Sequence, residues 1–477
     1  MSNPLAILQV APSDVAGGAE RSARNLHEIY KKLGHESWLA VGLKRDADPH
    51  VLEIPNEAHR NPWVRGWNQI LMRYEKSPAS VKGLGRMIRG LRELGQPLRE
   101  VRRQLGMDDF DYPATPLLPR LLPRSPDIIH FHNLHGNYFD LNCLAELSHR
   151  IPSILNLRDA WMLSGHCAFS FDCERWKTGC GQCPDLTIFP PLKRDATAHN
   201  WVQKRRILSQ CRLFVTTPSQ WLMDRVLASI VAPAIIEQRV IPNGVDTDIF
   251  RTGEKAAARA QLNLGQNLII LLTAANGIRH NVWKDYKTLR DAIASLAQKE
   301  DAKKIIVLAV GETSPSEMIG DIRVQFVPFE RDPVALATYY RAADVYLHTA
   351  KVESFGNVLV EARACGTPVV STAVGGIPEH VKSLSWDQAP AGIPVFASTE
   401  ATGILTPAAD GAAFAAAISI LLEKPALRAE MGRNGSLDVA GRFSLIVQAT
   451  RFLEWYREIL IKKPPMFVRR NEATISA

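Results

Sequence analysis

The sequence predicts an α/β protein made of two doubly wound domains, each with a mostly parallel sheet. Short apolar runs of strand length alternate with amphipathic stretches of helix length along the chain. The runs are almost continuously apolar, which is typical of parallel strands buried on both faces. A Pro-Asn-Gly interruption between Arg239 and Asp246 separates two sets of such runs. With 477 residues, 46% of them apolar, the chain can form two or three full cores.

Eight strand-like runs carry this interpretation. Those of the first half are LAILQVAP (5–12), DIIHFHN (127–133), PSILNLRD (152–159) and RLFVTTPS (212–219). Those of the second half are NLIILLTAAN (267–276), KKIIVLAVG (303–311), ADVYLHTA (343–350) and TPVVSTAVGG (367–376). We expect a first domain over 1–242, a second over 243–440, a helix over 441–463 that returns to the first domain, and a flexible basic tail over 464–477.

Charge and hydropathy restrict the class of protein. No apolar run approaches the roughly 20 residues of a membrane-spanning helix. The start, Met-Ser-Asn-Pro-Leu, lacks the basic and apolar parts of a signal peptide, so we expect a cytoplasmic protein. The net charge is +8, and residues 60–103 alone carry 11 Lys or Arg against 3 Glu. The excess positive charge is therefore local, and we treat 60–105 as a basic insert.

The insert interleaves Trp, Leu, Ile and Met with arginine, as in WVRGWNQILMRY. This pattern suits a helix that lies on an anionic membrane surface, and each cation can then add about 1 kcal/mol of binding. Nucleic acid is a competing partner for a basic patch. An insert folded onto its domain with a solvated basic face explains the pattern equally well.

Several predicted strands end in residues that suit a binding site, as expected where parallel strands end. Gly17 and Gly18 open a helix after the first strand, where backbone N–H groups can meet a phosphate or a sugar. A plain turn explains the glycine pair equally well, since no dinucleotide or Walker pattern is present. After a strand of the second half, Arg279 and Lys284 are suited to a diphosphate, although a solvated basic loop has the same spacing.

The stretch ESFGNVLVEARACGTPVV places Glu353 and Glu361 eight positions apart around a Phe-Gly-Asn turn. Taken alone, Glu361 could decorate a solvent-facing side of a helix and Glu353 could offset the helix dipole. Together with the Arg279 and Lys284 pair, the early Gly-Gly loop, IPNGVD and GGIPE, however, this stretch resembles the E-x7-E segment of glycosyltransferase family 4. That resemblance covers most of the chain. It implies the GT-B fold, in which two Rossmann-like domains face a central cleft, and a retaining reaction on nucleotide sugars.

The resemblance assigns roles to individual residues. By similarity, Glu361 binds the ribose hydroxyls and Glu353 faces the transferred sugar, and a carboxylate can accept bonds from two hydroxyls. Arg279 and Lys284 stabilise the departing diphosphate, which itself takes the acceptor proton, so no catalytic metal is expected. The remaining donor contacts are expected from backbone groups at Gly17, Gly18, Phe355, Gly356 and Asn357.

The first half is expected to bind the acceptor. His130 and His132 alternate onto one face of a strand and could suit a metal, but we assign them, with His135 and Asp159, to the acceptor cleft, and His132 also to catalysis. In NLRDAW, Arg158 replaces the histidine that relatives show before Asp-x-Trp, beside Asp159. Arg158 then either holds a phosphate or an anionic acceptor as a catalytic cation, or pairs with an acid as a structural strut.

Four cysteines lie within a short segment of the first half. Cys167, Cys173, Cys180 and Cys183 fall inside an insert over 162–190 and end in C-x2-C, with His166 as a spare ligand. In a cytoplasmic chain such a cluster favours structural zinc over disulfides. Packing roles suit Cys143, Cys211 and Cys365 better than they suit a cluster. A similar Cys-rich insert occurs in some polysaccharide-assembly members of the resembled family.

The predicted function is a hexosyltransferase-type retaining glycosyltransferase. It moves a sugar from a nucleotide-sugar donor to a saccharide, which we expect to be a lipid-linked intermediate of exopolysaccharide or lipopolysaccharide synthesis at the inner face of a membrane. The alternatives are a synthase of the same fold that acts on a sugar phosphate, and a catalytically silent subunit that binds nucleotide or glycan. Intact Glu353, Glu361, Arg279 and Lys284 argue against the silent subunit.

Overall fold

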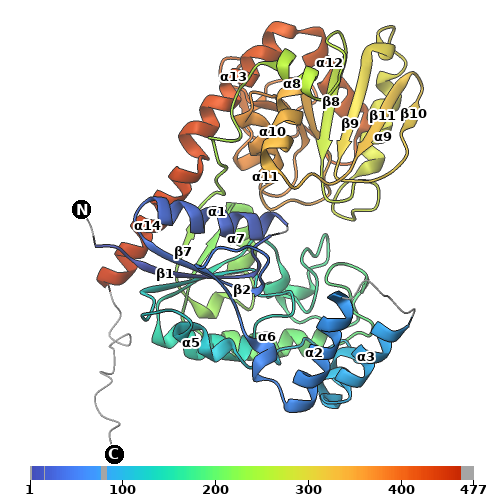
Figure 1. The fold of residues 1–477 in the computed structure, drawn as a ribbon. Helices are drawn as coiled ribbons and strands as arrows, with labels where there is room; N and C mark the ends of the chain where they lie inside the picture. The colour runs from blue at the N-terminus through green and yellow to red at the C-terminus, as the bar shows by residue number, and fades with distance from the viewer. Residues whose placement is uncertain (1–2, 16, 77–82, 463–477) are drawn as a thin grey trace, which may run out of the picture. The chain divides into compact units, whose positions relative to one another are not determined.

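The structure, a computed structural model, describes residues 3–15, 17–76 and 83–462, which form two compact units. Of the described residues, unit 1 comprises those within 3–217, 223–240 and 452–462, and unit 2 comprises 218–222 and 241–451. The last helix, α14 (Leu445–Lys462), contributes its first turns to unit 2 and its residues from Phe452 onward to unit 1 (Figure 1). The predicted tail over 464–477 lies outside the described residues.

Unit 1 is built on a parallel sheet of seven strands in the order β3-β2-β1-β4-β5-β6-β7. In that order the strands are Val51–Glu53, Glu36–Leu43, Ala6–Ser13, Ile128–His132, Ser153–Asn156, Leu213–Thr217 and Ile235–Val240. The chain winds outward in both directions from β1 and β4. The loops after these two strands therefore diverge at the carboxyl edge, which is where open α/β sheets bind ligands.

Helices cover both faces of this sheet. Leu8 and Val10 of β1 enter one core cluster, whereas Ala11 joins Leu39 and Val41 in a second cluster. In Figure 1, α1 lies along one side of the sheet and α5 with α6 along the other. The helices outside the insert are α1 (Gly18–Lys32), α5 (Leu144–Arg150), α6 (Thr197–Leu208) and α7 (Gln220–Leu227), the last of which begins in unit 2.

Unit 2 is built on nine strands in the order β10-β11-β9-β8-β12-β13-β16-β14-β15, and its central pairs are parallel. In that order the strands are Glu317–Ile319, Ile322–Val327, Ile305–Val310, Ile269–Ala274, Val345–His348, Val369–Thr372, Gly403–Thr406, Ser383–Leu384 and Val395–Phe396. Only the edge hairpin of β10 and β11 is antiparallel among the described strand pairs. The direction of winding reverses between β8 and β12, so this sheet also has a switch point.

The strands of unit 2 are buried on both faces, as their apolar sequences predict. Ile270 and Leu272 of β8 enter one core cluster, while Leu271 enters another with Leu347 of β12. The helices are α8 (Lys255–Gln261), α9 (Tyr286–Leu296), α10 (Pro333–Ala342), α11 (Asn357–Ala364), α12 (Gly411–Glu423) and α13 (Pro425–Arg442). The prediction of two doubly wound α/β domains is confirmed, and the eight predicted strands are β1, β4, β5, β6, β8, β9, β12 and β13.

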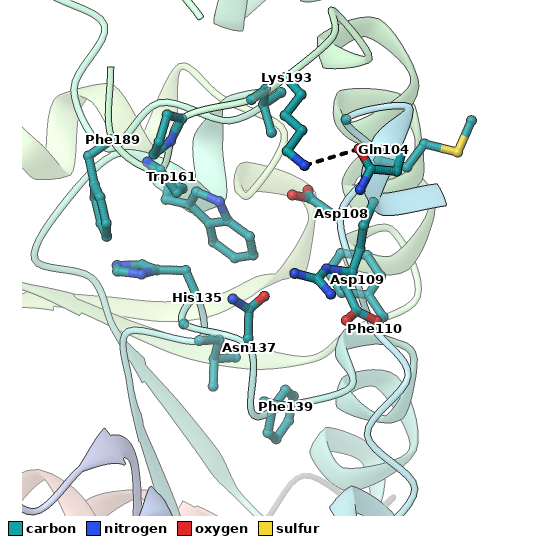
Figure 2. A pocket seen from close by; sticks show the side chains of 18 of the residues that line it. Gln104, Asp108, Asp109, Phe110, His135, Asn137, Phe139, Trp161, Phe189 and Lys193 are labelled. Carbon is teal, nitrogen blue, oxygen red and sulfur yellow. Dashed lines mark hydrogen bonds between the residues drawn. The ribbon is translucent and has the colours of Figure 1, made fainter. Parts of the chain in front are cut away.

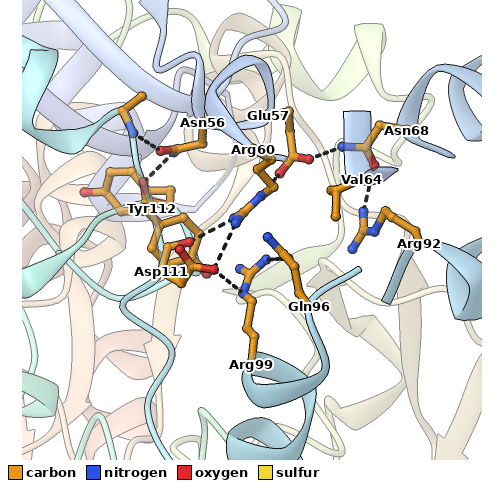
Figure 3. A network of polar contacts seen from close by, with 12 residues as sticks. Asn56, Glu57, Arg60, Val64, Asn68, Arg92, Gln96, Arg99, Asp111 and Tyr112 are labelled. Carbon is orange, nitrogen blue, oxygen red and sulfur yellow. Dashed lines mark hydrogen bonds and ion pairs between the residues drawn. The ribbon is translucent and has the colours of Figure 1, made fainter. Parts of the chain in front are cut away.

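The basic insert folds as three short helices, and Figure 3 shows several of its arginines inside a polar network. Arg60 is buried and its Nη1 donates to Asp111 Oδ2 at 3.1 Å. Arg99 Nε donates to Asp109 Oδ2 at 2.8 Å. These cations bind carboxylates of the domain, so the charge count overstated the free basic surface. The helices are α2 (Pro62–Lys76), α3 (Leu84–Glu93) and α4 (Pro97–Gln104).

No helix among the described residues is both long enough and apolar enough to cross a membrane.

Candidate functional site

At the switch point of unit 2, the structure brings Lys284 and Glu353 together. Lys284 follows β8 and Glu353 follows β12, the two strands between which the winding reverses. Lys284 Nζ donates to Glu353 Oε2 at 2.9 Å, and it lies 3.4 Å from His348 Nε2. A backbone bridge between Lys284 and Ala350 holds the first loop against the second. Two residues 69 positions apart thus form one ion pair at the carboxyl edge of the sheet.

The surroundings of Glu353 keep this carboxyl ionised. Burial by itself would raise the pKa of Glu353, but Lys284 and His348 outweigh burial and hold that pKa well below its usual range. Burial, with Lys284 beside it, lowers the pKa of His348 to about 4, so this imidazole is neutral at pH 7. About a fifth of each side chain of the pair stays exposed, at 18% for Lys284 and 20% for Glu353. The pair can therefore exchange partners with a polar ligand.

Arg279 is held by a carboxylate that sequence reasoning missed. Glu312, two residues after the end of β9, accepts bonds from the backbone N–H groups of Ile278 and Arg279, both at 2.9 Å. Its other oxygen accepts from Arg279 Nε at 2.5 Å. Although burial by itself would raise the pKa of Glu312, these bonds lower it to about 2. Arg279 and Lys284 therefore pair with different carboxylates, and the guanidinium stays one-third exposed.

Glycines shape the backbone around Glu353. Gly356 has a φ of 80° and precedes α11, where a side chain would be strained. A Cβ atom on Gly375 would lie only 1.9 Å from the carbonyl oxygen of Glu353. The neighbouring Gly376 donates its N–H to that same oxygen at 3.0 Å. The second glycine pair thus permits a close backbone approach that positions Glu353.

The other residues of the E-x7-E stretch lie mainly in the interior. The Phe355 side chain is 3% exposed and packs on His380, so any contact it makes with a ligand runs through its backbone. Asn357 Oδ1 accepts a bond from Asn243 at 3.0 Å. Glu361 is 6% exposed, and its Oε2 accepts a bond from the Tyr340 hydroxyl at 3.0 Å. Glu361 is thus oriented, and little of it is exposed.

In unit 1, the loops after β1, β4 and β5 form a second polar group. Gly17, with a φ of 57°, precedes α1, which begins at Gly18, and both glycines are exposed. A Cβ atom on Gly17 would lie 2.3 Å from Glu20 Oε2. Burial raises the pKa of the Glu20 carboxyl. The glycine conformation therefore makes room for a half-buried acid at the first turn of α1.

His135 and Asp159 form a hydrogen-bonded pair in the same unit. His135 Nε2 lies 2.8 Å from Asp159 Oδ2, and Asp159 Oδ1 accepts the Trp161 N–H at 2.9 Å. Burial by itself would lower the pKa of His135, but Asp159 and Glu20 outweigh burial and Lys204 and raise it. The pair holds the histidine ring beside the Trp161 indole, with ring centroids 5.6 Å apart.

His130, His132 and Arg158 lie deeper than expected. The two histidine rings stack with centroids 4.1 Å apart and have no exposed surface. Arg158 is 7% exposed; its Nη1 lies 3.0 Å from His132 Nδ1, and its Nη2 donates to Ser22 Oγ at 2.7 Å. Burial lowers the pKa of Arg158 to about 10. The three side chains are thus buried and contact one another or Ser22, and their expected part in acceptor binding or catalysis stays a prediction.

A pocket of about 410 Å³ opens beside the His135 pair, entirely within unit 1. Figure 2 shows the Trp161 and Phe189 rings on one side of the pocket and the polar side chains of Gln104, Asp108 and Asp109 on the other. Lys193 Nζ donates to Gln104 Oε1 at 3.0 Å across it. The volume lies within the range of small-molecule sites. Sequence reasoning missed this pocket because residues from the basic insert, from the loop after β4 and from the Cys-rich insert all line it.

The His135 pair predicts a pH-dependent contribution to stability. A raised pKa means that the contribution is fully present below the unfolded pKa of about 6.5 and is lost as pH rises through the higher folded value. Asp159→Asn keeps an oxygen for the Trp161 N–H but removes the negative charge. We expect this variant to lose more unfolding free energy at about pH 6 than at about pH 9.

Urea unfolding at both pH values measures the difference. Glu20 and Lys204 also face the ring, so NMR titration should show that the pKa of His135 itself falls in the variant.

Two sheets that each reverse their winding, with polar groups at the carboxyl edges, define an α/β protein of the two-domain GT-B type. The profile described as "Glycosyltransferase Family 4" matches residues 16–249, and "Glycosyl transferases group 1" matches residues 254–438. The chain belongs to glycosyltransferase family 4.

Curated relatives match part of the chain. A putative colanic acid biosynthesis glycosyl transferase, WcaC of Escherichia coli, is 28% identical over 52% of this chain and 60% of its own length. A D-inositol 3-phosphate glycosyltransferase of Segniliparus rotundus is 33% identical over 46% of this chain and 47% of its own. The chain thus spans about half the length of the curated relatives it matches.

Solved structures show the same fold over nearly the whole chain. Sucrose-phosphate synthase of Thermosynechococcus elongatus is 20% identical, with a TM-score of 0.59 over 96% of this chain and 99% of its own. Anabaena HepE in complex with UDP-glucose is 18% identical, with a TM-score of 0.57 over 95% of this chain and 100% of its own. WaaG, a glycosyltransferase involved in lipopolysaccharide biosynthesis, is 14% identical, with a TM-score of 0.55 over 93% of this chain and 98% of its own.

Proposed function

We propose that the protein is a retaining glycosyltransferase that transfers a sugar from a nucleotide-sugar donor to a saccharide. The observation that carries this proposal is the ion pair of Lys284 and Glu353 at the switch point of unit 2. There a cation can stabilise a diphosphate while the freed carboxylate accepts hydroxyl groups of the sugar. Solved neighbours whose titles name UDP and UDP-glucose support a nucleotide-sugar donor.

In the proposed reaction, the bond between the anomeric carbon and the diphosphate oxygen breaks as the acceptor oxygen bonds to the same face of that carbon. The acceptor proton passes to the departing diphosphate. Lys284 and Arg279 stabilise the negative charge that develops on this leaving group, which lowers the barrier directly. We propose that these two cations take the part that a metal ion has in other transferases. Glu361 orients the ribose, and the backbone from Phe355 to Asn357 supplies further donor contacts.

The pocket of unit 1 is the proposed acceptor site. Trp161 and Phe189 offer aromatic faces that suit the apolar face of a sugar ring, and Asp108 and Asp109 can accept bonds from sugar hydroxyls. The His135 and Asp159 pair adds a charged hydrogen-bonding group at the same place. We propose that Arg158 and His132 position this edge from below, and that His130 supports them.

We further propose that the acceptor is a lipid-linked glycan intermediate and that the insert contacts an anionic membrane. The names of WcaC and WaaG connect relatives of this fold with polysaccharide and lipopolysaccharide synthesis. Large apolar side chains of the insert are exposed, among them Leu94 at 67% and Leu98 at 76%. Exposed arginines lie on the same helices, and such mixed surfaces bind anionic lipid headgroups.

This membrane contact can be measured with vesicles that contain anionic lipid. Arg86, Arg89 and Arg102 are exposed, unlike Arg60, and their joint replacement by Gln should weaken binding by about fivefold per arginine at low salt. The effect should shrink as salt rises. The matched control replaces three exposed cations of unit 2 by Gln: Lys303, Arg323 and Lys424. Equal binding of both triple variants would contradict the proposed contact.

The function itself is tested with a panel of common nucleotide sugars. Donor hydrolysis, or transfer to glycan acceptors, should occur with at least one of them, and that donor should raise the melting temperature by binding the folded state. Transfer only to a phosphorylated sugar would favour the alternative of a synthase. The panel includes such acceptors because the names of the relatives mention inositol 3-phosphate and sucrose phosphate. Binding without turnover by any donor would favour a silent subunit and refute the proposal.

A further inference from the structure

Four cysteines and one histidine of unit 1 meet around a single small cavity. Cys167, Cys173, Cys180 and Cys183 are all unbridged, and together with His166 they line a cavity of about 20 Å³. That volume is on the order of one water-sized sphere, so it has room for one ion and for no organic ligand. The wall otherwise comes mainly from glycines, Trp176 and short polar residues.

His166 is oriented so that one ring nitrogen is available to this cavity. Its Nδ1 lies 3.2 Å from the backbone oxygen of Pro190, which can only accept, so Nδ1 carries the hydrogen. Its Nε2 is then left with a lone pair, and it lies 3.3 Å from Cys183 Sγ. A histidine whose far nitrogen donates to a carbonyl is the usual arrangement at protein metal sites.

The C-x2-C turn is held in a shape that suits metal binding. Cys180 Sγ accepts the N–H of Gly165 at 3.2 Å, and the N–H of Cys183 is bound by Asp195 at 2.7 Å. Between the two cysteines, Gly181 and Gln182 have φ values of 129° and 46°. Both cysteines line the same cavity, and an N–H group that donates to sulfur stabilises a thiolate.

We propose that this cluster binds one structural Zn²⁺. Cysteine sulfurs fill at least three of its four ligand positions, and His166 is the nitrogen donor available for the fourth. Zinc in structural sites takes four ligands of this kind in a tetrahedron. Among the described residues, three possible ligand atoms lie within 4.8 Å of one another only at His27, Glu28 and Asp48. The ligand atoms of the cysteine cluster are therefore more widely spaced, and zinc binding would draw the sulfurs inward. The group at His27, Glu28 and Asp48 suits a metal poorly, because Asp48 already pairs with Lys31 at 2.8 Å.

A metal in this position would brace the wall of the unit 1 pocket. The N–H of Ala168 donates to the oxygen of Phe189 at 2.8 Å, and His166 reaches the oxygen of Pro190. Phe189 and Pro190 in turn line the pocket described above. The cysteine segment has little regular structure of its own, so a metal crosslink would substitute for the core that a segment of this size lacks.

The proposal is tested on the whole chain, purified under reducing conditions without chelator from cells supplied with zinc. Elemental analysis should find about one zinc per chain. Replacement by Co²⁺ should give the intense near-ultraviolet band of cobalt bound to thiolate, and a chelator should remove the metal and make the cluster thiols reactive. The double variant Cys180→Ala, Cys183→Ala should lose the zinc. The matched control Cys143→Ala, at a half-buried cysteine outside the cluster, should keep it.

Zinc-free wild-type protein that also gives no cobalt band would overturn the proposal. So would a mass below that of the fully reduced chain under native conditions, because it would show that the cysteines form disulfides. Both outcomes are read on the wild type, so they decide the question even if the double variant fails to fold. The inference is independent of the proposed function: an inactive protein that binds zinc would support the metal site and refute only the transferase.

Discussion

Replacing Lys284 by alanine is expected to lower kcat/KM for the preferred nucleotide sugar by about 10²- to 10³-fold, the usual cost of losing one group that stabilises transition-state charge. The variant loses the cation proposed for the leaving diphosphate. It also leaves Glu353 without its partner at 2.9 Å, so the pKa of that carboxyl should rise. Steady-state kinetics across pH, with donor binding measured separately, would show whether the loss is mainly in kcat.

Lys287→Ala is the matched control for this experiment. Lys287 lies three positions along the chain, its side chain is 85% exposed, and it pairs with Asp291 one turn further on in α9. Such a surface pair contributes little, so this variant should keep its activity and its stability. A Lys284→Ala protein whose kcat/KM stays within about threefold of the wild type would exclude Lys284 from the chemistry.

Lys204→Met is expected to destabilise unit 1 by about 3 kcal/mol, the scale seen when one partner of a buried ion pair is removed. Lys204 is fully buried in α6, and its Nζ donates to the backbone oxygens of Trp161 and Ser164, both at 3.0 Å. The same nitrogen lies 3.2 Å from Asp108 Oδ2 and 3.6 Å from the centre of the Trp161 ring. Methionine has a similar length but satisfies none of these groups. Urea unfolding measures the loss.

Two further variants separate the buried charge from general damage. Lys193→Met changes an exposed lysine that lines the unit 1 pocket, and its effect on stability should be nearly neutral. Adding Asp108→Asn to Lys204→Met removes the carboxylate left without its partner, so the double variant should be less destabilised than the sum of the single changes. A Lys204→Met protein as stable as the wild type would show that this charge contributes nothing to the fold.

The sheets could be predicted because apolar runs of strand length report burial on both faces directly. The strand pattern did not, however, predict that His130 and His132 are buried. Alternation along β4 places both rings on one face, but it does not say that a helix covers that face, and here Tyr456 of α14 reaches His130 from more than 300 positions away. Sequence periodicity specifies sides of a strand, whereas solvent exposure depends on distant segments.

Charge partners were equally hard to foresee. Arg279 and Lys284 could be selected from their spacing after a strand, yet nothing in that spacing identifies Glu312 as the residue that holds Arg279. Arg60 and Arg99 belong to the excess of positive charge counted over 60–103, but carboxylates beyond the insert bind them. Composition gives the sum of charges in a segment, and only tertiary contacts decide which charges remain available to a partner.

The close approach at Gly375 has a consequence for anyone who wishes to redesign donor choice. Any side chain at this position would push against the carbonyl of Glu353, so a library that varies Gly375 would mostly sample proteins in which the Glu353 loop is distorted. Phe329, which follows β11, is by contrast 45% exposed. Substrate range is therefore better engineered from the neighbouring loops, while the glycine pair is kept as a fixed part of the scaffold.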